Sequence, residues 1–352
     1  MNIAFVLYGN SALPRGGSKI IYDYANYLAS NNHRVTLYFY GKCFLRSRKI
    51  PSVLKKLACR FFYNRWPDWY KFNEGVIKRT IFDYEKEIRK DEEVIIATDV
   101  RTAKPVSELS INCKKKMYFI QGFENWVLSD EEVFETYGLG LCNITVSNWL
   151  KNLVDMHSKI PSYCVPNGVN CDIFKKEKKI EDRDKFSIAF HYNSSKIKAG
   201  DDALEVVKKL HDKFSDLKVY VVSIEEKTNK IPDYINYVYK ASQEEVARIN
   251  NCCRVFLSTS VEEGFGLPGL EAMACGCVLV STRNTGVFEY ALDGENALLS
   301  DVHDIDGLVE CIRKVFDDLD LQKKLSENAL ATARKKSMDE STKKFEEIIA
   351  KE

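Results

Sequence analysis

The sequence has no hydrophobic stretch long enough to cross a membrane. None of its apolar runs approaches eighteen residues, so no transmembrane helix is predicted. Residues 1–10 are mostly apolar but carry none of the positive charges that begin a secretory signal peptide. We therefore expect a strand at this position and a cytoplasmic protein.

The cysteines lack the spacing of a zinc site or a redox motif. There are 11, an odd number, and no two are arranged as Cys-x-x-Cys. Several fall within expected strands or helices, among them Cys164, Cys252, Cys275 and Cys277. This pattern indicates reduced, buried thiols rather than a disulfide or zinc framework.

No acidic cluster stands in a loop suited to holding a divalent ion. The pair Asp201 and Asp202 is placed like the start of a helix, where the helix dipole favours acids. We therefore expect no bound metal ion and no other cofactor.

The length and the charge distribution indicate two different halves. At 352 residues the chain fits two domains, and 45% hydrophobic with 29% charged residues is typical of a globular protein. Residues 1–170 hold 24 lysines and arginines against 17 acidic residues, whereas the remainder holds 28 against 34. A basic first half favours an anionic partner surface.

The first half opens with the pattern of a βαβ unit. Residues 2–8 form a predicted strand, a loop with Gly16 and Gly17 follows, residues 18–30 have helical apolar spacing, and Arg34–Tyr40 is a second strand. In such units a ligand binds at the carboxyl end of the strand. A glycine pair is also common in βα turns that bind nothing.

The most informative stretch is residues 255–299. Val255–Ser258 predicts a buried strand, and Gly264 and Gly266 follow where the backbone turns tightly or approaches a ligand. Pro268 suits the first turn of a helix, which Gly276 ends. Residues 278–280 form the next strand. Unpaired amides at such a helix start are an anion site of the kind that binds phosphate.

Two glutamates bracket this turn. Glu263 lies in the loop, and Glu271 lies in what we expect to be the first helical turn, facing a solvent-accessible cleft. A carboxylate so placed accepts hydrogen bonds from a diol, as the acidic residue of dinucleotide-binding folds does from ribose. The alternative is an acidic solvated loop before a core helix.

These glutamates, with seven residues between them, resemble the donor-site signature of family 4 glycosyltransferases. Segments 285–289 and 294–299 resemble further conserved segments of that family, in the right order. The resemblance implies an α/β protein of the GT-B fold, with two doubly wound, Rossmann-like parallel-sheet domains facing across a cleft. It places an acceptor-side domain at 1–170, completed by a returning helix at 338–352, and a donor domain at 171–337.

The resemblance also implies roles for individual residues. Glu271 would hold the ribose hydroxyls, Glu263 would contact the donor sugar as a catalytic residue, and Gly16 and Gly17 would let the donor approach the first domain. The further donor-binding residues implied are Gly264, Phe265, Gly266, Leu267, Thr285, Gly286 and Val287.

The phosphate-binding loop departs from the family pattern. In the family, the loop here at 193–200 supplies an arginine and then a lysine before glycine, whereas this sequence has Lys196 and Lys198. Lys198, before Ala199 and Gly200, is the better match. A lysine neutralises phosphate as a point charge but lacks the bidentate geometry of arginine.

The acceptor side is less well defined. Residues 118–126 resemble a subgroup of bacterial family 4 enzymes that includes rhamnosyltransferases of surface polysaccharides. Many family members have a histidine near Gln121, so Gln121 and Glu124 are the nearest polar candidates here. Glu124 would orient or deprotonate the acceptor hydroxyl. The alternative is a helix cap or a surface carboxylate.

Residues 42–67 are basic and aromatic, with no acid between Asp23 and Asp68. Such a segment is typical of contact with an anionic membrane surface. A helix face packed on its own domain and a nucleic-acid patch are the alternatives, and we expect no nucleic acid. The residues assigned to membrane or acceptor contact are Arg46, Arg48, Lys49, Lys55, Lys56, Arg60, Phe61, Phe62 and Trp66.

Together these features predict a retaining glycosyltransferase. It would move a sugar from a UDP- or dTDP-sugar to a lipid-linked or polysaccharide acceptor, without metal, at the inner face of the membrane. Two alternatives stay open. A nucleotide-sugar 2-epimerase has the same fold but needs no acceptor, and a non-catalytic membrane adaptor subunit would need no intact donor site.

Overall fold

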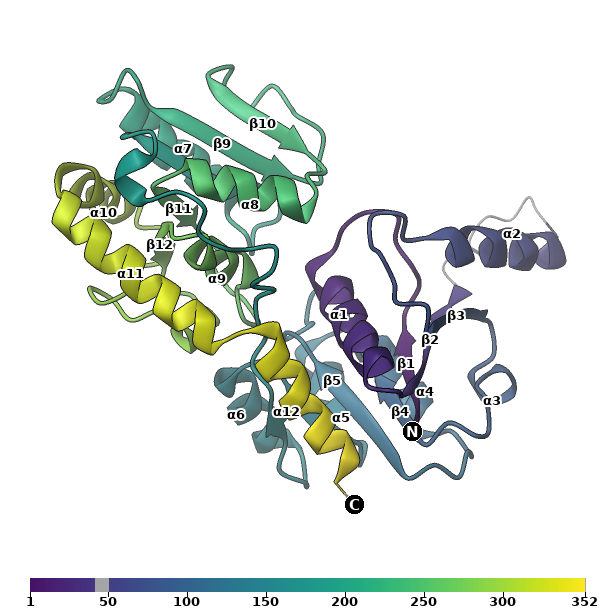
Figure 1. The fold of residues 1–352 in the computed structure, drawn as a ribbon. Coiled ribbons are helices and arrows are strands. Elements are labelled where there is room, and N and C mark those ends of the chain that lie inside the picture. The colour runs from purple at the N-terminus through teal and green to yellow at the C-terminus, as the bar shows by residue number, and fades with distance from the viewer. Residues whose placement is uncertain (42–50, 352) are drawn as a thin grey trace. The chain divides into compact units, whose positions relative to one another are not determined.

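The computed structural model describes residues 1–41 and 51–351, and its chain divides into two compact units (Figure 1). Unit 1 contains Met1–Pro166 together with the chain from Ser341 onward, and unit 2 is Asn167–Glu340. Each unit is built on its own parallel sheet.

Unit 1 has a sheet with strand order β3-β2-β1-β4-β5-β6-β7, and every pairing is parallel. The strands are β1 (Asn2–Leu7), β2 (Arg34–Tyr40), β3 (Val76–Ile81), β4 (Val94–Ala97), β5 (Lys115–Ile120), β6 (Cys142–Thr145) and β7 (Tyr163–Cys164). The helices are α1 (Gly16–Ser30), α2 (Ser52–Arg65), α3 (Tyr84–Glu87), α4 (Val100–Ser107), α5 (Asp130–Tyr137), α6 (Asn148–His157) and α12 (Met338–Ala350).

Helix α12 completes one face of the unit 1 sheet. Its residue Phe345 is fully buried, with ring centroids 6.1 Å from Phe5 of β1, 4.6 Å from Tyr24 of α1 and 5.5 Å from Phe119 of β5. On the opposite face, residues of α4, α5 and α6 form a second buried cluster with the strands. Both faces are therefore covered, which explains why the central strands β1 and β4 are almost entirely apolar and buried.

Unit 2 repeats this design with the strand order β10-β9-β8-β11-β12-β13, again all parallel. The strands are β8 (Ser187–His191), β9 (Lys218–Ser223), β10 (Ile235–Tyr239), β11 (Val255–Ser258), β12 (Val278–Thr282) and β13 (Ala297–Ser300). The helices are α7 (Gly200–His211), α8 (Gln243–Cys252), α9 (Leu267–Ala274), α10 (Ile305–Asp317) and α11 (Leu319–Lys335).

Helices cover both faces of the second sheet. Helix α7 packs with α10 on one face, and α8, α9 and α11 pack together on the other (Figure 1). The two units are thus Rossmann-like doubly wound domains, as the sequence predicted. Within the described ranges, no helix is long and apolar enough to span a bilayer.

Candidate donor-binding site

The candidate site of unit 2 lies where the direction of winding reverses. Strands β8 and β11 are neighbours, and the chain proceeds outward from them in opposite directions, to β9 and β10 or to β12 and β13. Loops after such strands border the crevice where open α/β sheets bind their ligands. The loops after β8 and β11 contain the predicted Lys198 and Glu263.

Direct hydrogen bonds hold these two loops together. The Thr259 hydroxyl donates to the Ala199 carbonyl over 2.9 Å, and the Val261 N–H donates to the Ile197 carbonyl over 2.8 Å. Ala199 has a φ of 45°, a left-handed conformation that is costly for a residue with a Cβ. The surrounding contacts therefore fix the backbone on both sides of Lys198.

An ion pair joins the two loops at their centre. Lys198 Nζ donates to Glu263 Oε1 over 2.6 Å, and the Ser260 hydroxyl donates to the same oxygen over 2.8 Å. The Glu263 side chain is 16% exposed and that of Lys198 is 40% exposed. The structure therefore brings together the residues predicted to contact the sugar and the phosphate.

The loop after β12 joins the same group. The Glu263 N–H donates to Thr285 Oγ1 over 3.3 Å, and the Thr285 hydroxyl donates to the Glu263 carbonyl over 3.0 Å. A Cβ on Gly286 would lie 2.8 Å from that carbonyl oxygen, so only glycine permits this approach. Three loops thus meet at Glu263.

Helix α9 begins and ends as its sequence predicted. Gly266, at the N-cap, has a φ of 87°, and its carbonyl accepts a hydrogen bond of 2.7 Å from the Tyr290 hydroxyl. The Phe265 ring is buried, with its centroid 5.4 Å from that of Tyr290. At the other end, the N–H groups of Gly276 and Cys277 donate to the Met273 and Ala272 carbonyls, a Schellman arrangement.

Glu271 lies deeper than expected. It is the fifth residue of α9, just beyond the first turn, and only 7% of it is exposed. The expectation of a solvent-accessible carboxylate in the first turn was therefore wrong. Helix α9 packs against β11, β12 and α11, and this packing covers the residues beyond its first turn.

The amides near Gly286 have a partner within the chain. The N–H groups of Gly286 and Val287 both donate to Asn284 Oδ1, over 3.2 and 3.0 Å, and Asn284 is buried. Phosphate binding by these amides stays a prediction. Gly264 and Leu267 are half-buried, and Lys196 is exposed.

Unit 1 has a second group of predicted residues at its own reversal of winding, between β1 and β4. Gly16 and Gly17 begin α1, and a Cβ on Gly17 would lie 3.6 Å from the Gln121 side-chain amide. A Cβ on Gly16 would meet nothing within 4 Å. Gly17 and Gln121 are therefore neighbours, while Gly16 borders open space.

Glu124 caps a helix. Its Oε2 accepts a hydrogen bond of 2.6 Å from the N–H of Val100, the first residue of α4. Burial, together with the nearby charge of Asp99, raises its pKa to about 8, although the Val100 N–H and Arg101 oppose the shift. The capping alternative is thus realised, and a catalytic role for Glu124 stays a prediction.

Sequence analysis missed the neighbours of Glu124. Arg101 donates to both carboxylate oxygens of Asp99 over 2.7 and 2.6 Å, and its guanidinium lies 3.8 Å from the centroid of Tyr8. Burial raises the pKa of Tyr84, which stacks on Tyr40 with centroids 4.4 Å apart. The available signal was Thr98 and Asp99, the two polar residues directly after the short buried strand β4. They lie at the carboxyl end of that strand, where such sheets bind ligands.

The predicted membrane segment is described in part. Arg46, Arg48 and Lys49 lie outside the described residues. In α2 and just after it, Lys56, Arg60, Phe61 and Phe62 are exposed, and Lys55 and Trp66 are half-buried. No three histidine, cysteine, aspartate or glutamate residues of the described ranges are grouped to hold a metal ion.

The chain is similar to known glycosyltransferases. Residues 172–332 match the sequence model of the family "Glycosyl transferases group 1". An uncharacterized glycosyltransferase of Methanocaldococcus jannaschii, MJ1178, is 28% identical over 202 residues, which cover 56% of this chain and 55% of that protein. The serotype-specific mannosyltransferase WbdA of Escherichia coli is 31% identical over 94 residues, or 27% of this chain and 11% of WbdA.

Solved structures extend the similarity to the whole chain. The Anabaena protein Alr3699/HepE, crystallised with UDP and glucose, has a TM-score of 0.77 and 13% identity, with all of both chains covered. At that identity the likeness concerns the fold alone. This chain spans about half, or less, of the length of the curated relatives it matches.

The two parallel-sheet units define the class: the chain has the GT-B fold of these structural neighbours. The match to the group 1 glycosyltransferase model, residues 172–332, falls within its second unit. The Lys198–Glu263 pair lies within that matched domain.

Proposed function

We propose that this protein is a glycosyltransferase that uses a nucleotide-diphosphate sugar as donor. The observation that carries the proposal is the Lys198–Glu263 ion pair at the reversal of winding in unit 2, inside the matched family domain. A cation for diphosphate and a carboxylate for sugar hydroxyls stand side by side there. The structural neighbour crystallised with UDP and glucose supports a uridine donor as the first to test.

Donor binding would exchange the partners of this pair. The diphosphate would take the Lys198 ammonium, with Lys196 nearby on the same loop, because phosphate carries more charge than one carboxylate. Glu263 Oε1 would then accept from a sugar hydroxyl in place of the Lys198 ammonium, while the Ser260 hydroxyl and Thr285 keep its position. Glu271 would accept from the ribose hydroxyls.

The proposed reaction retains the configuration of the anomeric carbon. The bond between that carbon and the diphosphate oxygen breaks, and a bond from the acceptor oxygen forms on the same face of the sugar. The acceptor proton passes to the departing phosphate oxygen, so no protein nucleophile is needed. Lys198 would stabilise the charge that develops on that oxygen.

The acceptor is proposed to be a lipid-linked or polysaccharide hydroxyl. The similarity to a serotype-specific mannosyltransferase supports a glycan, and the basic, aromatic segment of unit 1 supports an acceptor held at an anionic membrane. We propose a peripheral position at the inner face of the membrane. The rhamnosyltransferase-like subgroup belongs to the same proposal, through the resemblance of residues 118–126.

The test is a panel of donors with a matched pair of variants. UDP- and dTDP-linked hexoses, including dTDP-rhamnose, are screened by calorimetry and by release of nucleoside diphosphate, with and without membrane extract as acceptor. Glu263→Gln should keep nucleotide binding and lose turnover, whereas the control Glu262→Gln should keep both. A wild-type protein that binds no nucleotide sugar would sink the proposal.

The same assay separates the two alternatives. A 2-epimerase would release UDP without any acceptor, and a non-catalytic adaptor would neither bind nor turn over a donor. Acceptor-dependent release of nucleoside diphosphate distinguishes the transferase from both.

A further inference from the structure

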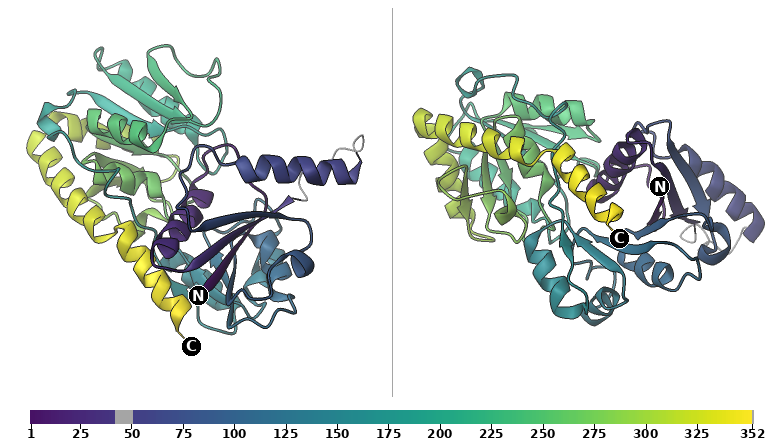
Figure 2. Two further views of the ribbon diagram at one scale, coloured as in Figure 1. Left: turned by 45° about the vertical axis from the view of Figure 1, so that its right-hand side comes forward. Right: turned by 60° about the horizontal axis from the view of Figure 1, so that its bottom comes forward.

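Helix α2 carries its apolar side chains outward. Figures 1 and 2 show α2 at the outer edge of unit 1, beside the edge strand β3. Cys59 and Tyr63, four residues apart, are buried against the unit. The outward residues, which we call the α2 apolar face, are 41–66% exposed and comprise Val53, Leu54, Leu57, Phe61 and Phe62.

Basic side chains border this face, and α2 contains no acidic residue. The Arg65 guanidinium lies 4.1 Å from the centroid of Phe61, and Lys56 and Arg60 lie over the Phe82 ring at 5.4 and 5.5 Å. An apolar face with cationic flanks is the pattern of a helix that lies in the interface of an anionic bilayer. A helix that packed against its own domain would bury these residues instead.

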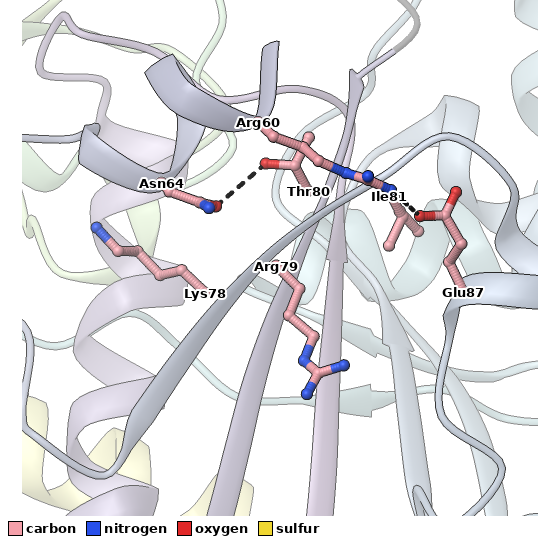
Figure 3. Close-up of a pocket in the computed structure, with 7 residues that line it drawn as sticks. All are labelled: Arg60, Asn64, Lys78, Arg79, Thr80, Ile81 and Glu87. Atoms are coloured by element: carbon pink, nitrogen blue, oxygen red, sulfur yellow. Dashed lines mark hydrogen bonds and ion pairs between the residues drawn. The ribbon is translucent and has the colours of Figure 1, made fainter. Parts of the chain in front are cut away.

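A basic pocket of about 250 Å³ adjoins α2. Figure 3 shows its lining, which comes from α2, from β3 and from the end of α3: Arg60, Asn64, Lys78, Arg79, Thr80, Ile81 and Glu87. Lys78 and Arg79 are successive residues of β3, a strand at one edge of its sheet, so they lie on opposite faces of that strand and point apart in Figure 3.

The charge of this pocket is positive. Its one acid, Glu87, is occupied: it accepts from Arg60 over 2.9 Å and from the N–H groups of Phe82 and Asp83. Lys78 donates only to the Trp66 carbonyl, over 3.1 Å, and burial lowers its pKa. Arg79 is exposed, and its side chain forms no ion pair or hydrogen bond with any residue of the described ranges.

We infer that α2 and β3 form a docking surface for an anionic lipid bilayer. The α2 apolar face enters the interface, and the basic pocket attracts the phosphates of lipid headgroups through the positive charges of Lys78 and Arg79 on the two faces of β3. Nearby, Asn64 and Thr80, 3.4 Å apart, offer an amide and a hydroxyl to the same headgroup. The inference deepens the proposed function. It rests on that function only for the reason why the protein would dock on a membrane.

The experiment measures cosedimentation of the full chain with vesicles at low salt. Vesicles are phosphatidylcholine alone or with about a third phosphatidylglycerol. Two double variants test the two parts: Leu57→Ser with Phe61→Ser, and Lys78→Gln with Arg79→Gln. Their matched controls in unit 1 are Met156→Ser with Ile160→Ser, two exposed apolar residues, and Lys104→Gln with Lys159→Gln, two exposed lysines.

Wild type and both controls should bind only the anionic vesicles. Each removed charge near a membrane surface should weaken partitioning about fivefold, so the basic variant should lose about 25-fold. The apolar variant should lose at least tenfold. UDP affinity, measured on the same preparations, should be unchanged in all, so loss of docking and failure of the donor site are told apart.

Several results would overturn the inference. The first is that wild type does not cosediment with anionic vesicles, and the second is that the control variants lose as much vesicle binding as the test variants. The third is that the protein binds inorganic phosphate through Lys78 and Arg79 but does not bind vesicles. A change of oligomeric state on Leu57→Ser with Phe61→Ser, without vesicle binding by wild type, would assign the face to a second copy of the chain instead.

Discussion

Replacing Lys198 by methionine tests whether the Lys198–Glu263 pair serves a ligand or the fold. The change removes the ammonium group 2.6 Å from Glu263 Oε1 and keeps most of the aliphatic chain. If Lys198 binds the diphosphate, a charge-assisted interaction of about 1.5–3 kcal/mol is lost. The dissociation constant for UDP should then rise about 10- to 150-fold.

The fold should respond far less. The Lys198 side chain is 40% exposed, and ion pairs at such positions contribute roughly 0–1 kcal/mol because solvent screens them. The free energy of unfolding, measured in urea, should therefore fall by less than about 1 kcal/mol. A large loss of affinity with a small loss of stability is the expected outcome.

Calorimetry with UDP and with uridine provides the internal comparison. Lys198→Met should weaken UDP binding but leave the affinity for uridine, which has no phosphate, unchanged. Lys196→Met is the matched control, because Lys196 is exposed on the same loop and forms no ion pair within the described ranges. Unaltered UDP affinity in the Lys198 variant would refute the assignment, and a loss confined to the Lys196 variant would move the phosphate contact to that residue.

Four further predictions concern other parts of the molecule. Glu271→Gln should weaken nucleotide binding by one to two orders of magnitude in calorimetry, since charge-assisted bonds are worth about 1.5–3 kcal/mol; unaltered affinity would count against a ribose contact. Turnover in excess EDTA should stay near its level in magnesium, and rescue of a chelated enzyme by magnesium would contradict this. Burial raises the pKa of Glu124 to about 8, so the folded state holds a proton that the unfolded state releases. The stability of the wild type relative to Glu124→Gln should therefore decline from about pH 4.5 to pH 8, by a few kcal/mol at most; parallel unfolding curves would refute it. Phe345→Ala should cost about 3–5 kcal/mol in urea unfolding, as for other large buried aromatics, and a cost below about 1 kcal/mol would disprove its role in the core.

The fold was predictable because its signals are local and repeated. Val255–Ser258, the glycines after it and Gly276 specify a strand, a turn and a helix end by backbone chemistry alone, and the structure has all three. Strands β3 and β10 gave no such signal. Each lies at one edge of its sheet, and polar residues such as Lys78 and Asn236 interrupt their apolar pattern.

The site was predictable in its members but not in its contacts. The family resemblance assigned Lys198 and Glu263 to the same donor site. Their direct pairing was not predicted, because it depends on the left-handed conformation of Ala199 and on the hydrogen bond from Thr259. Burial of Glu271 depends on how closely α9 approaches the sheet, a tertiary distance that no local pattern encodes. The role of Asn284 as acceptor for the Gly286 and Val287 N–H groups was also not predicted, because it depends on the path of the loop after β12.

Helix α12 has a consequence for synthesis of the chain. Unit 2 is an insertion between two parts of unit 1, because Ser341 and the residues after it belong to the unit that Met1 begins. During synthesis, Phe5 and Tyr24 therefore stay uncovered until Phe345, which is encoded after the whole of unit 2, has also been made. Unit 2 is complete in sequence before unit 1 is, so the nascent chain carries an uncovered aromatic surface throughout its elongation, a state in which such surfaces favour aggregation. A ribosome that stalls between the codons for Glu340 and Phe345 would leave a finished second unit attached to an unfinished first.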